Sequence, residues 1–244
     1  MPVSVVMTVY NGHGFLRAQV KSILDQLEAG DELVVVDDAS TDDSIELLKS
    51  LNSSQIKVFQ NTENQGVIKS FERGLKLAHE EVIFLSDQDD IWLPGKRSAF
   101  VAQFERNRST LVVISDAEVI NGEGRIMAPS FMALRHGFNG GLIATLWRNR
   151  YLGCAMAIRS SLLKIALPIP RSVPMHDMWL GVLGKVKGRI VYLSTPYLQY
   201  RRHSANATQM LSQFRWKDIA RWRVGLLIAL LRRILESKLG GGSG

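Results

Sequence analysis

The sequence predicts an α/β fold in which a mostly parallel central sheet carries helices on both faces. Over about the first 85 residues, apolar runs that suit buried strands alternate with segments whose apolar residues have helical spacing. The connections between successive strands are long enough for the right-handed crossovers that parallel neighbours require. The expected strands are residues 3–9, 33–36, 56–59 and 82–85, and the expected helices are residues 15–27, 44–51 and 67–78.

After residue 90 the pattern is less regular, and residues 122–141 are rich in loop-forming types. The expected elements here are helices at residues 94–106, 160–166 and 177–186 and strands at residues 111–115, 153–158 and 190–193. We expect residues 1–211 to form the α/β domain and residues 212–239 to form a basic amphipathic helix or helix pair. Residues 240–244, Gly-Gly-Gly-Ser-Gly, resemble a flexible linker.

The composition is that of an ordinary globular protein with a basic excess. Of the 244 residues, 46% are hydrophobic and 22% are charged, and the net charge is +7. No helix-turn-helix, zinc-finger or RNA-recognition motif accompanies this charge, so we expect no nucleic-acid partner. A phosphorylated substrate or an anionic membrane surface remains as the expected partner of the basic residues.

The sequence gives no sign of export. The N-terminus lacks the basic n-region of a signal peptide, and no segment reaches the roughly 20 apolar residues of a membrane span. The single cysteine, Cys154, lies in an apolar run and is expected to be buried and reduced. We therefore expect a cytoplasmic protein whose C-terminal helix lies on the inner face of the membrane, on its own domain or on a partner subunit.

Two acidic clusters follow two of the predicted strands. Asp37–Asp38 follows the second strand, and Asp87–Asp90, with Gln88 inside it, follows the fourth. Ligands of an open parallel sheet bind at the carboxyl ends of its strands, so both clusters are expected to face one site. Neighbouring carboxylates repel one another, and a divalent cation completed by substrate phosphates relieves this repulsion. The alternative is that such acids cap helices or lie in solvated turns, which we favour for Asp42 and Asp43.

Three segments carry a resemblance to a known enzyme family. They are Val6-Met7-Thr8-Val9-Tyr10-Asn11-Gly12, Val36-Asp37-Asp38-Ala39-Ser40-Thr41-Asp42 and Ser86-Asp87-Gln88-Asp89-Asp90-Ile91-Trp92-Leu93-Pro94. Together they look like family-two inverting glycosyltransferases of the Rossmann-like GT-A fold. The Ser-Asp-Gln-Asp-Asp-x-Trp form is similar to bacterial rhamnosyltransferases that build O-antigen and related polysaccharides. The resemblance covers about residues 3–208 and implies metal-dependent hexosyl transfer with Mg²⁺ or Mn²⁺ as the cofactor.

The resemblance also implies roles for individual residues. Asp89 matches the metal-binding acid of the family's Asp-x-Asp motif, and Thr8 departs from the family, in which proline is common there. The expected contacts with the nucleotide-sugar donor are Thr8, Tyr10, Asn11, Asp37, Asp38, Lys69, Asp87, Gln88 and Arg201.

Two later segments complete the expected site. Met175-His176-Asp177-Met178-Trp179 resembles the family segment that carries the catalytic base. It makes Asp177 the expected base, with His176 and Trp179 on the acceptor side. Without the resemblance, Asp177 also fits a helix cap. Tyr200-Arg201-Arg202-His203 resembles a late family segment, so Arg201 is expected at the diphosphate and His203 at the metal.

The expected reaction is the inverting transfer of rhamnose or another hexose from a dTDP-, UDP- or GDP-sugar. The expected acceptor is a hydroxyl of a glycan or of a lipid-linked molecule in bacterial surface polysaccharide synthesis. One alternative is a sugar nucleotidyltransferase, which should have a glycine-rich loop bearing Arg and Lys where this chain has Tyr10–Gly14. Another is a non-enzymatic, receiver-like signalling domain, which Asp37–Asp38 suggest but the length of the chain disfavours.

Overall fold

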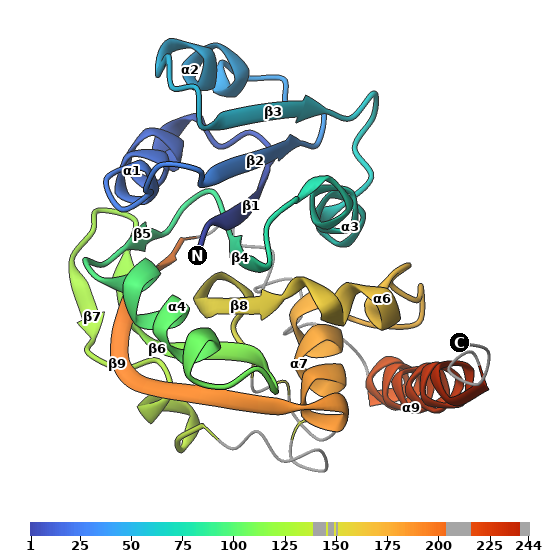
Figure 1. Ribbon diagram of the computed structural model, residues 1–244. Helices are drawn as coiled ribbons and strands as arrows, with labels where there is room; N and C mark the ends of the chain where they lie inside the picture. Colours follow the sequence, from blue (N-terminus) through green and yellow to red (C-terminus); the bar gives the residue numbers. More distant parts are fainter. Residues whose placement is uncertain (139–144, 146–148, 150, 204–215, 240–244) are drawn as a thin grey trace.

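The computed structural model describes residues 1–138, 145, 149, 151–203 and 216–239. A nine-stranded sheet forms its centre, and helices lie on both faces of the sheet (Figure 1). The α/β class expected from the sequence is therefore confirmed.

The N-terminal half is a parallel sheet made of strand–helix–strand units. Its elements are β1 (Val3–Val9), α1 (His13–Leu24), β2 (Glu32–Asp37), α2 (Ser44–Ser50), β3 (Ile56–Gln60), α3 (Val67–Leu77) and β4 (Val82–Ser86). The strand order is β3-β2-β1-β4, and every neighbouring pair is parallel. All residues of β1, β2 and β4 are buried, which explains why these strands are mainly apolar runs rather than alternating patterns.

The C-terminal half makes the sheet mixed, whereas the sequence predicted a mostly parallel one. Its elements are β5 (Ile91–Trp92), α4 (Lys96–Arg106), β6 (Thr110–Asn121), β7 (Ile126–Ala128), β8 (Met156–Arg159), α6 (Leu163–Ala166), α7 (His176–Lys187) and β9 (Arg189–Arg202). Strand β8 is antiparallel to β4 and β6, while β6 is parallel to β9. The short strands β5 and β7 add antiparallel pairs at β9 and β6.

Two of these strands extend well beyond the apolar runs that predicted them. Strand β6 has 12 residues and β9 has 14, although only residues 111–115 and 190–193 were expected. Their polar continuations pair with each other as far as Asn121 and Arg202. Backbone pairing, which leaves no trace in hydropathy, therefore carries the end of β9 to the acidic cluster, where the Arg201 N–H donates to Asp90 Oδ1 at 2.9 Å.

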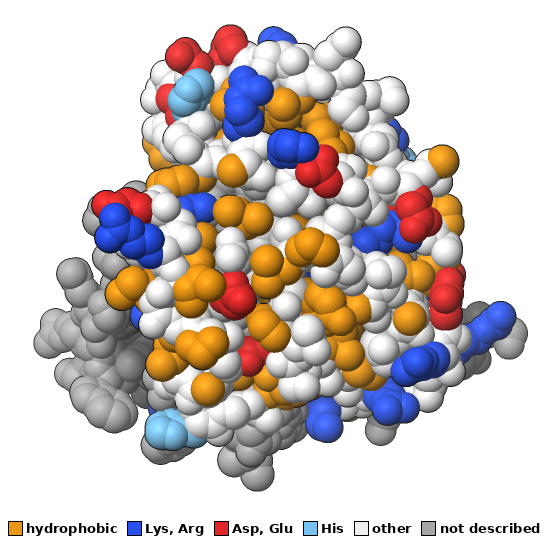
Figure 2. Space-filling model, turned by 90° about the vertical axis from the view of Figure 1, so that its left-hand side faces the viewer, with side chains coloured by type: hydrophobic (Ala, Val, Ile, Leu, Met, Phe, Trp, Pro, Cys, Tyr) orange, Lys and Arg blue, Asp and Glu red, His pale blue; other side chains and the backbone are white. Residues whose placement is uncertain are grey.

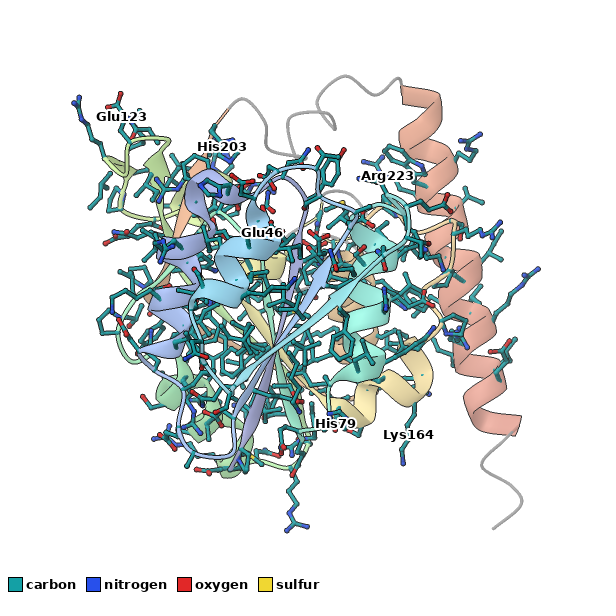
Figure 3. All side chains as sticks on the ribbon, turned by 90° about the horizontal axis from the view of Figure 1, so that it is seen from above. Glu46, His79, Glu123, Lys164, His203 and Arg223 are labelled. Atoms are coloured by element: carbon teal, nitrogen blue, oxygen red, sulfur yellow. The ribbon has the colours of Figure 1, made fainter. Side chains whose placement is uncertain are left out.

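A long helix, α9 (Trp216–Leu239), lies along one side of the domain (Figures 1 and 3). Its start at residue 212 was expected, but residues 212–215 lie outside the described residues. Leu226, Ala229 and Leu230 form its buried side. Among the helices of the described residues, none has both the length and the apolar composition that crossing a bilayer requires.

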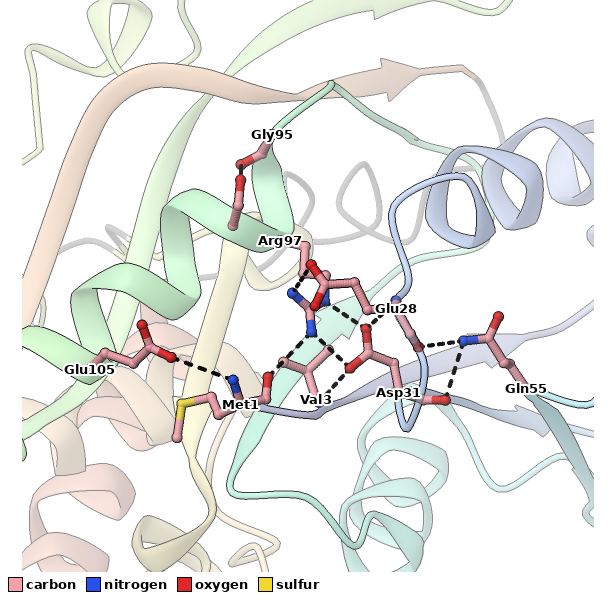
Figure 4. Close-up of polar contacts among 9 residues, drawn as sticks. Met1, Val3, Glu28, Asp31, Gln55, Gly95, Arg97 and Glu105 are labelled. Atoms are coloured by element: carbon pink, nitrogen blue, oxygen red, sulfur yellow. Dashed lines mark hydrogen bonds and ion pairs between the residues drawn. The ribbon is translucent and has the colours of Figure 1, made fainter.

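A buried ion pair ties α4 to the start of the sheet (Figure 4). Arg97 Nε and Nη2 donate to the two carboxylate oxygens of Asp31 at 2.6 and 3.0 Å. Asp31 also accepts the N–H groups of Val3 at 2.9 Å and Glu28 at 2.6 Å. Because the Asp31 side chain is fully buried, its negative charge depends on these partners for stabilisation.

Asp31→Ala is expected to lower the free energy of unfolding by about 3 kcal/mol, because it removes the buried carboxylate of Arg97 and leaves the guanidinium only the exposed carboxylate of Glu28 at 2.7 Å. Urea denaturation measures this loss. Asp25→Ala is the matched control, since the Lys21–Asp25 pair is exposed and its loss is expected to cost less than about 1 kcal/mol. Equal losses in the two variants would show that the Arg97–Asp31 pair does not hold the two parts together.

Candidate functional site

The loops that follow β1, β2 and β4 meet at one edge of the sheet. The Gln88 side chain donates to the Tyr10 carbonyl at 3.0 Å and accepts the Tyr10 N–H at 2.8 Å. Asn11 Oδ1 accepts the N–H of Thr41 at 2.8 Å. The three motif loops therefore form one surface at the carboxyl ends of the parallel strands.

Gly12 lies where this surface leaves no room for a side chain. A Cβ on Gly12 would lie 2.4 Å from Gln88 Oε1. Gly12→Ala is therefore expected to displace the Gln88 amide from Tyr10 and so to weaken donor binding, with little loss of stability because the amide is the far end of a flexible side chain. The measurement is the rise in melting temperature on adding a nucleotide sugar. Gly14→Ala is the control, because a Cβ there meets nothing within 4 Å; equal rises in both variants would contradict the prediction.

Asp37 and Asp38 are buried, and their oxygens are used within the protein. Asp38 Oδ1 accepts from Asn61 Nδ2 at 2.7 Å, and the N–H groups of residues 65 and 66 donate to the Asp38 carboxylate at 2.9 and 2.8 Å. Asp37 Oδ1 accepts from Ser40 Oγ at 2.5 Å. These carboxylates are thus neither helix caps nor solvated turn residues, and they fix the loops after β2 and β3.

The remaining predicted donor contacts differ in exposure. Tyr10 is 46% exposed at the edge of this surface, and Thr8 is buried at the end of β1. Lys69 instead forms an ion pair with Glu72 at 3.2 Å and lines a groove beside Pro168. The structure therefore does not bring Lys69 to the acidic cluster, because α3 directs its side chain toward Glu72 and the groove.

The acidic cluster is crowded with carboxylates. Burial, followed by the charges of Asp89 and Asp177, raises the pKa of the Asp87 carboxyl to about 7. Burial and the charges of Asp89 and Asp87 raise the pKa of Asp90 well above its ordinary value. Asp177 lies on α7, and a Cβ on Gly153 would lie 3.3 Å from Asp177 Cβ. The next residue, Cys154, has its sulfur within 4.8 Å of an Asp87 oxygen, so α7 and the loop after β4 face each other.

Asp89 and His203 lie side by side. His203 Nε2 and Asp89 Oδ2 are hydrogen-bonded at 2.8 Å, and the His203 ring packs on Phe15 at a centroid distance of 4.9 Å. Two adjacent ligands at about 2.1 Å from one octahedral ion lie about 3 Å apart, so this separation suits shared coordination. The structure thus brings together the two residues that the sequence assigned to a metal.

A second donor set is present beneath the first. Ligand atoms of Asp87, Asp90 and Cys154 lie within 4.8 Å of one another. Burial raises the pKa of the Cys154 thiol well above its ordinary value, so the sulfur carries a proton. Mg²⁺ and Mn²⁺ favour oxygen ligands over sulfur. The donor chemistry therefore favours Asp89 and His203, with Asp87 adjacent, as the holders of a divalent cation.

Arg201 lies among the carbonyl groups that surround the acidic cluster. The residue is 5% exposed, and its guanidinium donates to the carbonyl of Asp89 at 2.8 Å and to those of Asn121 and Gly122 at 3.1 Å. The guanidinium also lies 4.9 Å from the Phe15 ring centroid. A buried guanidinium engaged by three carbonyls positions the backbone of the cluster, and its contact with a diphosphate stays a prediction.

Asp177 lies in the first turn of α7 and is 5% exposed. Its Oδ1 accepts the Met178 N–H at 2.6 Å and Asn149 Nδ2 at 3.1 Å. Burial nevertheless raises its pKa to about 6. The bond from the Met178 N–H agrees with the alternative that Asp177 caps the start of α7. A carboxyl with a pKa this close to neutrality also suits a general base.

The two residues expected on the acceptor side belong to the core. Trp179 is fully buried, and its Nε1 donates to the Ala166 carbonyl at 2.8 Å. His176 is 3% exposed and stacks on Phe71 at 4.0 Å, and burial lowers its pKa to about 3. Positions 176 and 179 are one helical turn apart and share the inward side of α7. In this structure Trp179 therefore offers an acceptor no surface and His176 almost none, and their contact with an acceptor stays a prediction.

Residues that support the cluster also include some without a sequence signal. Gln19 donates to the Asp87 carbonyl at 3.1 Å, and Asn149 orients Asp177. Lys96 is fully buried, donates to the Cys154 carbonyl at 2.7 Å and has its pKa lowered by burial to about 8. The sequence alone does not reveal that Gln19 and Asn149 support the cluster, because these residue types are common everywhere. Lys96 could have been recognised once α4 was placed, because a lysine on the buried side of a helix needs a polar partner.

Comparison with known proteins agrees with this geometry. The profile of glycosyl transferase family 2 matches residues 4–165. An uncharacterised glycosyltransferase of Nostoc is 32% identical over 129 residues, which cover 51% of this chain and 39% of that protein. The Escherichia coli UDP-Glc:alpha-D-GlcNAc-diphosphoundecaprenol beta-1,3-glucosyltransferase WfgD is 26% identical over 74% of this chain and 69% of its own length.

The fold has a solved counterpart. Residues 1–349 of Staphylococcus aureus TarS, crystallised with UDP-GlcNAc, superpose with a TM-score of 0.75 at 21% identity, covering 95% of this chain and 67% of the TarS chain. This chain therefore spans less than half of the Nostoc relative and about two thirds of the TarS fragment. Since the family profile covers most of the α/β domain, with its motif loops and acidic cluster, the chain belongs to glycosyl transferase family 2.

Proposed function

We propose that this chain is an inverting glycosyltransferase in which Asp177 is the general base. The observation that carries the proposal is the place of Asp177 beside the acidic cluster: it lies against Gly153, and the adjacent Cys154 has its sulfur within 4.8 Å of Asp87 and Asp90 oxygens. The rise of the Asp177 pKa to about 6 agrees with this role. Asp177 removes the proton of the acceptor hydroxyl as that oxygen attacks the anomeric carbon on the side opposite the diphosphate. A carboxylate with this pKa is ionised at neutral pH and is a stronger base than an ordinary aspartate.

Asp89 and His203 are the proposed holders of a divalent cation, with Asp87 beside them on the donor side. When bound, Mg²⁺ or Mn²⁺ supplies positive charge that offsets the charge of the leaving diphosphate. Arg201 fixes the backbone carbonyl of Asp89 at 2.8 Å and so holds the cluster in place. Fixed charges of this kind account for a large part of many enzymatic rate enhancements.

The donor and acceptor classes draw support from the relatives. The name of WfgD specifies UDP-glucose and a lipid-linked diphosphate acceptor, and TarS was crystallised with UDP-GlcNAc. We propose a UDP-activated hexose as the donor and a glycan or lipid-linked hydroxyl in bacterial polysaccharide synthesis as the acceptor. The UDP-sugars of these two proteins favour a UDP-hexose over rhamnose, and over the dTDP or GDP carriers that the sequence left open.

A thermal-shift screen tests the donor assignment. UDP-, GDP- and dTDP-sugars are each added with and without Mn²⁺, and a ligand that binds only the folded state raises the melting temperature. We expect the largest rise with a UDP-hexose and Mn²⁺ together. A rise with GDP- or dTDP-sugars alone would overturn the nucleotide assignment, and no rise with any sugar nucleotide would overturn the proposed function.

Neither alternative from the sequence gains support. In the turn after β1, the Tyr10 backbone makes two hydrogen bonds with the Gln88 side chain. A nucleotidyltransferase needs a glycine-rich loop with basic residues at this place. The Asp37–Asp38 pair of the receiver-like alternative is buried and engaged by Ser40 and Asn61. Labelling of Asp87 by acetyl phosphate would revive the receiver-like alternative.

A further inference from the structure

The outward side of α9 is an apolar ridge. Its members recur at helical spacing, and each is between 39% and 59% exposed: Val224, Leu227, Ile228, Leu231 and Leu235. The domain covers the opposite side of the helix, as the burial of Leu226 and Leu230 shows. A helix that only packs on its own domain turns polar residues outward, so packing within the domain does not account for the ridge.

The contacts of α9 with the domain hold the ridge in this outward orientation. Ser172 Oγ donates to the Gly225 carbonyl at 3.3 Å, and Arg233 Nη2 donates to the Pro168 carbonyl at 2.7 Å. A Cβ on Gly225 would lie 2.8 Å from Ser172 Cβ, so the helix approaches this segment closely. The side bearing the ridge is therefore fixed relative to the domain.

Basic residues border the ridge. Arg221 and Arg232 are exposed and follow Ile228 on the helical wheel, at one edge of the ridge. Within α9 the sequence has six Lys or Arg residues and two Asp or Glu residues, so the helix has a clear positive excess. Figure 2 shows the side of the molecule turned away from α9, where charges of both signs are interspersed among hydrophobic side chains.

A groove with a volume of about 490 Å³ runs between α9 and residues 168–172. Arg171 and Arg232 line it, and within the described part of the chain neither has a recorded hydrogen bond or ion pair. The other two cations of the groove are engaged, Lys69 by Glu72 at 3.2 Å and Arg233 by Glu236 at 3.5 Å. Glu236 also lines the groove and is paired with Arg233, so the groove keeps a positive excess, and its two arginines without a partner among the described residues suit the phosphate of a lipid headgroup.

We propose that α9 docks this protein on the surface of an anionic lipid bilayer. The ridge enters the interface, and Arg171, Arg221 and Arg232 contact lipid phosphates. An apolar strip bordered by arginine is the composition of helices that lie in membrane interfaces, and each basic residue near an anionic surface adds to the attraction. A second copy of this chain is a poorer occupant, because joining two ridges brings their arginine borders together.

Co-sedimentation with vesicles tests the proposal without donor or acceptor, so its outcome is independent of the transferase activity. We expect binding to phosphatidylcholine vesicles that contain phosphatidylglycerol, little binding to pure phosphatidylcholine, and weaker binding at high salt. Leu231→Ser is expected to weaken binding about tenfold, and Arg171→Gln and Arg232→Gln about fivefold each. Leu134→Ser and Arg125→Gln are matched exposed controls on other elements and are expected to bind normally.

Three outcomes would overturn the proposal. One is the absence of binding to anionic vesicles, and a second is equal binding by Leu231→Ser and Leu134→Ser. The third is a dimer seen in sedimentation velocity that the Leu231→Ser variant no longer forms, with no binding to vesicles. That result would assign the ridge to an interface with a second copy. The melting temperature of each variant shows that it is folded.

Discussion

Asp177→Asn is expected to lower the rate of sugar transfer by about 100- to 10,000-fold while the protein stays folded. Asparagine keeps the shape of the side chain and an oxygen that can accept the Met178 N–H, which now lies 2.6 Å from Asp177 Oδ1. It cannot take a proton from an acceptor hydroxyl. Single-turnover transfer from a UDP-sugar, measured beside the melting temperature, separates the loss of a base from the loss of structure.

The pH dependence of the native protein gives a second readout of the same group. The pKa of Asp177 is raised from 3.8 to about 6, so the base is protonated below pH 6 and ionised above it. We therefore expect kcat/KM to rise with pH through about 6 and then to level off. Asp177→Asn is expected to remove this rise from the residual activity.

The stability of Asp177→Asn has a predictable sign. Folding raises the pKa of this carboxyl, so its ionisation disfavours the folded state increasingly as the pH passes from 3.8 to about 6 and fully above that. At pH 7 the asparagine variant is therefore expected to melt no lower than the native protein. If it melts as expected but transfers sugar at a near-native rate, Asp177 is a helix-capping residue and not the base.

The sequence was informative where burial and function leave local patterns. The apolar runs of β1, β2 and β4 gave their positions, because strands buried on both faces are almost wholly apolar. The acidic residues directly after β4 could be assigned to a ligand site, because carboxylates in an apolar setting need partners. The pairing of Asp89 with His203 came from the family resemblance, since nothing local connects residues 114 positions apart.

The sequence was uninformative about side-chain direction, which backbone pairing and helix orientation decide. Arg201 has the residue type that binds phosphate, but its place on β9 beside the Asp89–Asp90 backbone turns its donors toward carbonyl groups. Trp179 lies two residues from the proposed base, yet the rotation of α7 buries it against Ala166. Side-chain chemistry predicted which residues can act, whereas only the fold showed which of them face the site.

Asp89→Ala is expected to reduce transfer about 100- to 1,000-fold and to abolish the extra melting-temperature rise that Mn²⁺ gives with a UDP-sugar. The reason is that Asp89 provides the carboxylate oxygen 2.8 Å from His203 Nε2. His203→Ala is expected to weaken the same Mn²⁺ effect while leaving the carboxylates in place. Asp43→Ala is the matched control, because it removes an exposed acid that makes no capping bond at the start of α2.

The same assay decides between the two donor sets of the cluster. Asp89→Ala and Asp90→Asn are compared for the Mn²⁺-dependent part of the thermal shift. If Asp90→Asn removes that part and Asp89→Ala retains it, the cation is held by the Asp87–Asp90–Cys154 set, and the assignment to Asp89 and His203 is wrong. We expect the opposite result, because Mg²⁺ and Mn²⁺ favour oxygen ligands over the sulfur that completes the Asp87–Asp90–Cys154 set.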